Sequence, residues 1–145
     1  MTDLSDAPGA PIDPAVEAAL AASADARSAS LREFARIPSV SALPEHANDM
    51  VVAAEWVAER LRRVGATEVA VEATALHPIV YGRIHEAPGA PTVLLYAHYD
   101  VQPVDPVELW ETAPWEPFLR DGRFVGRGVA DDKAHIVMHL TAIEA

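Results

Sequence analysis

The sequence predicts an α/β fold, because helical patterns fill its first part and strand patterns follow them. Up to Val64, apolar residues recur at steps of three or four, as they do along one face of a helix. Val69 and Val71 then alternate with polar neighbours, which is the pattern of a strand. The run Thr92–Ala97 is apolar without alternation, which predicts a central strand buried on both faces. We therefore expect helices packed on a mostly parallel or mixed sheet.

The first helix is expected to run from Pro14 to about Arg36. Asp13 is a suitable N-cap residue, and proline is favoured at the first helical position. Pro38 should end the helix, since the residue before a proline is pushed out of the helical region. The preceding residues 1–12 are rich in Ala, Pro, Asp and Gly, and this composition predicts a disordered tail.

A second helix is predicted from about Asn48 to Val64, with Gly65 as its C-terminal stop. Its apolar face comprises Met50, Ala53, Val57, Leu61 and Val64.

The remaining elements are predicted to be short strands, a loop and a final helix. Ile79–Ile84 is expected to form a strand, and the proline-rich run Pro103–Pro117 a long ordered loop. Asp121-Gly122 lies between two apolar pairs and predicts a two-residue hairpin turn. A last helix should begin near Asp132. Its apolar stripe comprises Ile136, Leu140 and Ile143.

Composition limits the classes of function. The 22 acidic and 11 basic residues give a net charge of −11, which argues against nucleic acid or an anionic membrane as a partner. There is no cysteine, so a metal would have to be held by His, Asp and Glu. The first residues lack the basic and apolar regions of a signal peptide, and no apolar run approaches the ~20 residues of a membrane span. A cytoplasmic protein is expected.

The first candidate site is His98-Tyr99-Asp100, directly after the predicted central strand. In an extended chain, His98 and Asp100 point to the same side, so one can bind a metal while the other orients its imidazole. Taken alone, a His-x-Asp at a strand end is more often structural. Tyr99 is expected to pack there.

The second candidate site is Asp131-Asp132-Lys133, which follows Gly126-Arg127-Gly128. Acidic residues in the first turn of a helix can be explained by capping alone. The glycines favour a functional interpretation modestly, because they let the backbone approach another group closely.

Together, the runs "LLYAHYDVQPV", "LWETAPWEPF" and "DGRFVGRGVADDK" resemble the zinc metallopeptidase family of carnosinases, aminoacylases, glutamate carboxypeptidases and succinyl-diaminopimelate desuccinylases. The run His-Tyr-Asp-Val-Gln-Pro and the Trp-containing loop are most similar to its dipeptidase branch. "FARIPSVSALPEH" and "AAEWVAERLRRVGA" resemble the opening helices of the family, so the resemblance extends from about Leu31 to Ala145.

The resemblance implies a catalytic domain with two zinc ions, although manganese or cobalt could replace zinc. It makes His98 a ligand of one metal, Asp100 the catalytic-site carboxylate behind it, and Asp131 the bridging ligand. It also implies a cis peptide bond between Asp131 and Asp132. The substrate would be a small peptide, and the full-length protein could be a homodimer.

The sequence departs from the family in two places. Ala134 stands where the family usually has glycine after Asp-Asp-Lys. The Glu-Glu pair that supplies the family's general base is also missing, since Glu144 is the only acid after Asp132. We therefore expect residues 13–145 to be the N-terminal portion of the catalytic domain, inactive when isolated. An N-acyl amino acid amidohydrolase and a non-catalytic module that binds metal or a protein partner are the alternatives.

The other histidines and the hairpin arginines can be explained without a role in the site. His135 and His139 lie four residues apart, but no glutamate follows His135, so a zincin-like zinc face is not expected. Isolated surface or loop positions are expected for His46, His77 and His85. Arg123 and Arg127 could meet substrate carboxylates, although arginines are common on hairpin surfaces.

Overall fold

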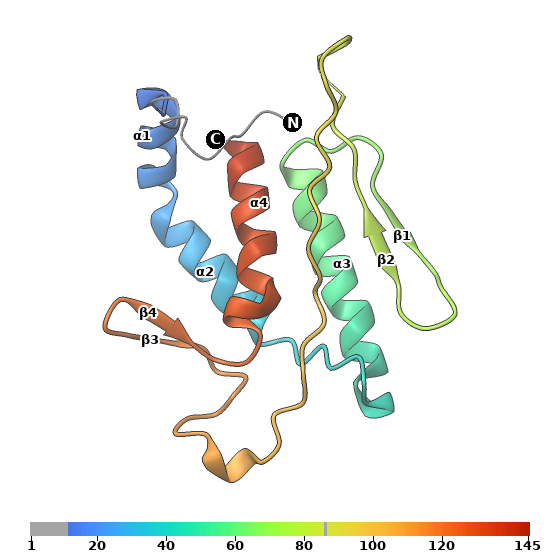
Figure 1. The fold of residues 1–145 in the computed structure, drawn as a ribbon, viewed down its shortest axis with the longest axis vertical. Helices are drawn as coiled ribbons and strands as arrows, with labels where there is room; N and C mark the ends of the chain where they lie inside the picture. The colour runs from blue at the N-terminus through green and yellow to red at the C-terminus, as the bar shows by residue number, and fades with distance from the viewer. Residues whose placement is uncertain (1–11, 86) are drawn as a thin grey trace, which may run out of the picture.

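The computed structural model describes residues 12–85 and 87–145, so the predicted disordered tail lies outside the described residues except for Ile12. Within these ranges, helices α2, α3 and α4 run side by side, with a hairpin at either edge of the molecule (Figure 1). The helices are α1 (Pro14–Ala22), α2 (Ala24–Ala35), α3 (Ala47–Arg63) and α4 (Ala134–Glu144). The strands are β1 (Ala70–Glu72), β2 (Ile79–Tyr81), β3 (Phe118–Arg120) and β4 (Arg123–Val125).

The first predicted helix has the expected ends but is two helices, α1 and α2. Asp13 caps α1 as expected, its Oδ1 accepting from the N–H of Ala15 at 2.8 Å. The break lies at Ser23, whose hydroxyl donates to the carbonyl of Ala19 at 2.9 Å and accepts from Arg27 at 2.7 Å. A serine hydroxyl that bonds to the preceding turn competes with the helical ladder, and the single-helix prediction did not allow for this.

Helix α3 agrees with its prediction to within one residue at each end. Gly65 follows it with a φ of +93°, and its N–H donates to the carbonyl of Arg62 at 3.2 Å. The N–H of Ala66 donates to the carbonyl of Leu61 at 3.0 Å. These bonds satisfy carbonyls that the helix end leaves free, and the left-handed conformation explains the glycine.

The core lies between α2, α3 and α4. Phe34 of α2 is fully buried and stacks on Trp56 of α3, with ring centroids 4.1 Å apart. Helix α4 adds Ile136, Val137 and Leu140 to the same cluster. The start of α4 is therefore fixed against the end of α2, which matters because the Asp131-Asp132 motif immediately precedes α4. Among the described residues, no helix is long and apolar enough to cross a membrane.

The strands form two separate antiparallel hairpins, β1–β2 and β3–β4, and the described residues contain no larger parallel or mixed sheet. The predicted turn at Asp121-Gly122 is confirmed. Both residues have positive φ, 49° and 75°, as a two-residue turn matching the twist of its strands requires.

The prediction of a buried central strand at Thr92–Ala97 is wrong for this structure. The segment is extended and passes between α4 and α3 in the view of Figure 1, but no described strand pairs with it. Val93, Leu94 and Tyr96 are 77%, 88% and 80% exposed. An apolar run gives a segment the tendency to pair and be covered, but it becomes a buried strand only where neighbouring strands and helices exist. Among the described residues, no strand pairs with this segment, and the side chains of Val93, Leu94 and Tyr96 are not covered.

Candidate metal site

The imidazole of His98 lies between two carboxylates. Its Nδ1 is 3.1 Å from Oδ1 of Asp100, and its Nε2 is 3.1 Å from Oδ1 of Asp131. Asp100 is two residues away in the chain, whereas Asp131 is 33 residues away. The two motifs therefore face each other, and Asp100 and Asp131 lie on opposite sides of the imidazole ring.

This arrangement is electrostatically suited to a cation. Carboxylates only accept, so both ring nitrogens can donate to them only when the imidazole carries a proton on each. Burial lowers the pKa of His98, but the negative charges of Asp100 and Asp132 outweigh it and raise the pKa above its ordinary value. A metal between Nε2 and Asp131 could replace the shared proton, while Asp100 kept the other proton on Nδ1.

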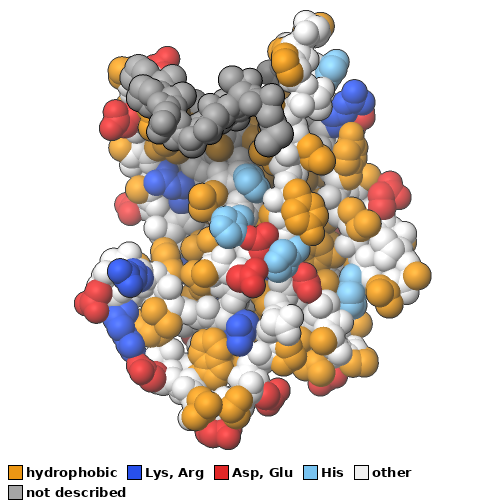
Figure 2. All heavy atoms as spheres, viewed as in Figure 1, with side chains coloured by type: hydrophobic (Ala, Val, Ile, Leu, Met, Phe, Trp, Pro, Cys, Tyr) orange, Lys and Arg blue, Asp and Glu red, His pale blue; other side chains and the backbone are white. Residues whose placement is uncertain are grey.

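Asp131 and Asp132 point in different directions. The Asp131 carboxylate is 85% exposed, while that of Asp132 is 12% exposed. The peptide bond between them is cis, as the resemblance implied. Figure 2 shows red and pale blue side chains meeting near the middle of the viewed face, so acidic and histidine groups gather there.

Asp132 joins the two motifs through its carboxylate. Its Oδ2 accepts from the backbone N–H of His98 at 2.9 Å, and its Oδ1 contacts Nδ1 of His135. Burial raises the pKa of Asp132, but the hydrogen bond from His98 and the contact with His135 outweigh this, so the pKa lies below its ordinary value. Asp132 is therefore held as a carboxylate that positions His98.

The side chain of Lys133 also holds the Asp131–Lys133 turn in place. Its side chain is fully buried, and Nζ donates to the carbonyls of Phe34 at 3.0 Å and Ile37 at 2.5 Å. These carbonyls lie at and just beyond the C-terminal end of α2, where a helix leaves acceptors unsatisfied. Burial lowers the pKa of Lys133 to about 7, although Asp49 opposes the shift. This role of Lys133 was not predicted, because no local sequence pattern indicates which carbonyls a lysine will reach.

Gly128 lets the two motifs approach each other. A Cβ atom added there would lie 2.4 Å from Cγ1 of Val101, and the residue has a φ of +74°. A side chain would therefore push apart the segment that follows Asp100 and the turn that precedes Asp131. The expectation that these glycines allow a close backbone approach is confirmed at this position.

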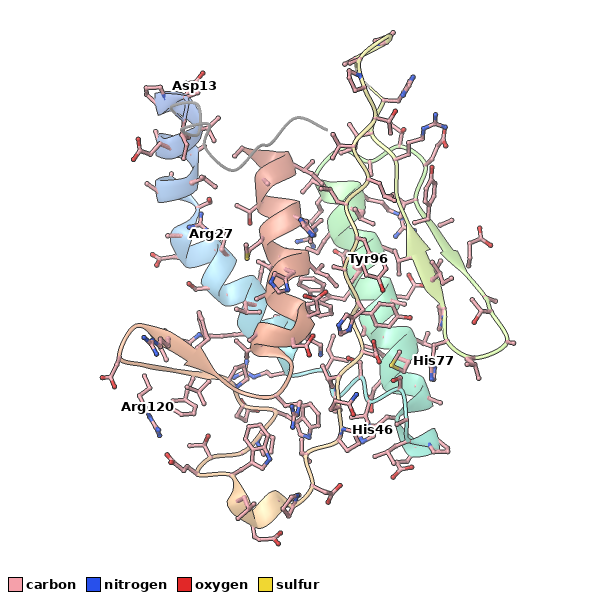
Figure 3. The ribbon with its side chains drawn as sticks, in the orientation of Figure 1. Asp13, Arg27, His46, His77, Tyr96 and Arg120 are labelled. Carbon is pink, nitrogen blue, oxygen red and sulfur yellow. The ribbon has the colours of Figure 1, made fainter. Side chains whose placement is uncertain are left out.

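The other candidate residues lie elsewhere or have other contacts. His139 Nε2 is 3.3 Å from the carbonyl of Tyr96, so His135 and His139 do not face a common point. His46 and His77 lie near the N-terminal end of α3 (Figure 3), where His46 Nδ1 is 2.7 Å from Oδ2 of Asp49. The Arg127 guanidinium lies 5.2 Å from the Trp110 ring centroid.

His98 and Asp131 are two potential metal ligands, which is fewer than a complete metal site needs. Structural zinc sites have four ligands, and catalytic sites have at least three from the protein. No group of three or more His, Asp or Glu side chains that could hold a metal occurs in residues 12–85 and 87–145. The pair fits a metal in chemistry and direction, because an imidazole nitrogen and an exposed carboxylate converge on one point.

The chain is similar to known peptidases. It is 38% identical over 105 residues to the cysteinylglycine-S-conjugate dipeptidase of Corynebacterium striatum, an alignment covering 72% of this chain and 23% of the relative. It is 34% identical over 119 residues to the Cys-Gly metallodipeptidase dug1 of Schizosaccharomyces pombe, covering 75% and 25%. The chain thus spans about a quarter of the length of these curated relatives.

The fold is also that of solved peptidases. Human carnosine dipeptidase 1 superposes with a TM-score of 0.83 at 26% identity, covering 92% of this chain and 31% of that one. The M20 family metallo-carboxypeptidase Sso-CP2 of Sulfolobus solfataricus gives 0.73 at 34% identity, covering 81% and 26%. These neighbours confirm the predicted fold class. Residues 94–145, which contain His98, Asp100 and Asp131, match the model of Peptidase family M20/M25/M40.

Proposed function

We propose that this chain is part of a metal-dependent dipeptidase that cleaves short peptides with zinc-activated water. The observation that carries the proposal is the His98 imidazole, held between Asp100 and Asp131 at 3.1 Å on either side. Two relatives support the substrate class, since both are named as dipeptidases.

In this proposal, His98 and Asp131 hold metal and Asp100 acts through His98. Asp131 is suited to bridge two ions because its carboxylate is exposed and has a second oxygen free of His98. Asp100 holds the proton on Nδ1, so that Nε2 presents its lone pair to the metal. When bound, zinc would supply a nucleophile at neutral pH by lowering the pKa of a water to about 7.

The proposal concerns a longer protein. Since the chain spans 23% and 25% of two dipeptidase relatives, we propose that residues outside these 145 supply the general base and the remaining ligands. The isolated 145-residue chain should then be inactive. We further propose zinc as the metal, with manganese or cobalt as alternatives, a homodimer, and the cytoplasm as its location.

A second candidate is an N-acyl amino acid amidohydrolase. The observation that favours it is a match of 46% identity over 56 residues to the succinyl-diaminopimelate desuccinylase of Nitrosospira multiformis. This match covers 39% of the chain, against 72% for the cysteinylglycine-S-conjugate dipeptidase. The dipeptidase relatives therefore account for more of the sequence.

The test is a substrate panel on the full-length protein loaded with zinc. Dipeptides and N-succinyl or N-acetyl amino acids are assayed side by side, with and without a chelator. We expect dipeptides to be cleaved faster, and the chelator to abolish cleavage. Faster turnover of the N-acyl amino acids would favour the amidohydrolase, and chelator-resistant cleavage would contradict both candidates.

A further inference from the structure

We propose that Ser41 is a positioning residue of the metal site, acting through Asp100 on the imidazole of His98. This inference rests on the proposed function, because it assigns Ser41 a role in that same site. Its hydroxyl donates to Oδ2 of Asp100 at 2.6 Å, while Oδ1 of Asp100 lies 3.1 Å from Nδ1 of His98. One carboxylate thus joins the serine to the imidazole.

The Ser41 hydroxyl fixes the rotation of the Asp100 carboxylate, which the contact with His98 alone does not fix. A carboxylate with a single partner can turn about its bonds and still keep that contact. With a donor on each oxygen, the Asp100 carboxylate has one favoured orientation, and the imidazole plane follows from it. The side chain of Asp100 is 35% exposed, so without Ser41 water could compete for Oδ2.

The backbone around Ser41 is anchored to the segment that it supports. The carbonyl of Ser39 accepts from the N–H of Val101 at 2.9 Å, and the Ser39 hydroxyl donates to the carbonyl of Tyr99 at 2.6 Å. Ser39 and Val40 are 0% and 1% exposed. Figure 1 shows the loop between α2 and α3 crossing the chain that carries His98. Ser41 therefore extends from a fixed crossing point.

A contact from His77 also holds the backbone of Ser41. Nε2 of His77, in the loop between β1 and β2, lies 2.9 Å from the Ser41 carbonyl. Segments far apart in sequence thus converge behind His98: the α2–α3 loop, the β1–β2 loop and the segment that carries Asp100. A serine bound in this way differs from a surface serine that happens to touch a carboxylate.

The test is a double-mutant cycle on the full-length protein, using Ser41→Ala and Asp100→Ala. Dipeptide cleavage (kcat/KM) and zinc affinity, measured by chelator competition, are determined for both single variants and the double variant. Ser41→Ala should lower kcat/KM about 10-fold and weaken zinc affinity in the same direction, as the loss of a group behind a ligand typically does. Ser41→Thr, which keeps the hydroxyl, should retain wild-type values.

The decisive comparison is the effect of Ser41→Ala in the Asp100→Ala background. If Ser41 acts only through Asp100, its removal there should change kcat/KM by less than about 2-fold, because coupled residues are non-additive. Ser23→Ala is the matched control: it removes a bonded hydroxyl at the α1–α2 junction and should change neither quantity.

Two results would overturn the assignment: a full loss from Ser41→Ala in the Asp100→Ala background, or failure of Ser41→Thr to restore the wild-type values. Wild-type protein that binds zinc but cleaves no dipeptide would contradict the proposed function instead. The cycle would then be decided on zinc affinity alone.

Discussion

The Asp131–Lys133 turn and the Thr92–Ala97 segment both border the candidate metal site, yet different contacts hold them. The turn is fixed by side chains: Asp132 accepts from the backbone of His98, and Lys133 donates to two carbonyls of the α2 end. The segment has large apolar side chains in solvent, such as Leu94 at 88% exposed. The turn therefore has its bonding partners within the described residues, whereas the apolar side chains of the segment are left uncovered.

The difference shows where the site gets its rigidity. His98 lies at the junction of the two regions, and its backbone N–H bonds to Asp132. Val101, three residues on, bonds to the buried Ser39. The site is therefore fixed from its C-terminal side, and the geometry around His98 does not need a paired strand before it.

The largest expected effect comes from the buried Lys133. Its pKa is about 7 in the folded chain, against an ordinary 10.5, so between these values the unfolded chain binds more protons. The free energy of unfolding should therefore rise with pH, by about 1.4 kcal/mol per unit and roughly 4 kcal/mol from pH 7 to pH 10. Denaturant unfolding at a series of pH values measures it.

Lys133→Met is the control for that titration. It keeps a long apolar stem and removes the ionising group, so the rise between pH 7 and pH 10 should disappear. A flat wild-type profile would contradict the burial argument. A rise that survives in Lys133→Met would assign it to another group.

Gly128→Ala should have the next largest effect. The added Cβ would lie 2.4 Å from Val101, and alanine is also strained at a φ of +74°. We expect a loss of about 2–4 kcal/mol, part from left-handed strain and part from overpacking. Thermal unfolding measures the loss.

Gly122→Ala separates the two causes. Gly122 has a nearly equal φ of +75°, but an added Cβ would meet nothing within 4 Å. Its cost should be the strain alone, about 1–2 kcal/mol. Equal losses for the two variants would show that the close approach of Gly128 to Val101 is unimportant.

The smallest effect is expected in the exposed segment. Leu94→Ser should change the stability of this chain by less than about 0.5 kcal/mol, since Leu94 covers little. Leu140→Ala, in the core, should cost about 2–5 kcal/mol. Chemical denaturation of both variants measures the two losses in the free energy of unfolding. A loss above 1 kcal/mol for Leu94→Ser would mean that the segment is covered in solution.

Local features of the fold could be predicted from the sequence. The Asp13 cap, the Gly65 stop and the Asp121-Gly122 turn each depend on residues only a few positions apart. The break at Ser23 was missed because a serine within an apolar repeat gives no sign of whether it bonds to its own turn. Thr92–Ala97 was predicted wrongly because burial is set by neighbours that the run itself does not specify.

The candidate site also combines features that were predicted from the sequence with features that were not. The pairing of His98 with Asp131 came from the family resemblance, and the structure brings the two side chains together across 33 residues. Ser41 and Lys133 gave no usable signal, because their bonds span 59 and 99 residues. Such contacts depend on the path of the chain at the end of α2 and in the α2–α3 loop. The spacing of apolar residues does not predict this path.

We propose above all that His98 and Asp131 bind the same metal. The most direct test is the zinc content of the full-length protein and of its His98→Ala, Asp131→Ala and Asp100→Ala variants, measured by atomic emission after dialysis. We predict reduced zinc in His98→Ala and Asp131→Ala, since each loses a ligand. Asp100→Ala should mainly lose activity, by about 10–100-fold. Full stoichiometric zinc in Asp131→Ala would contradict the claim, and the Asp131-Asp132 motif would then be only the cap of α4.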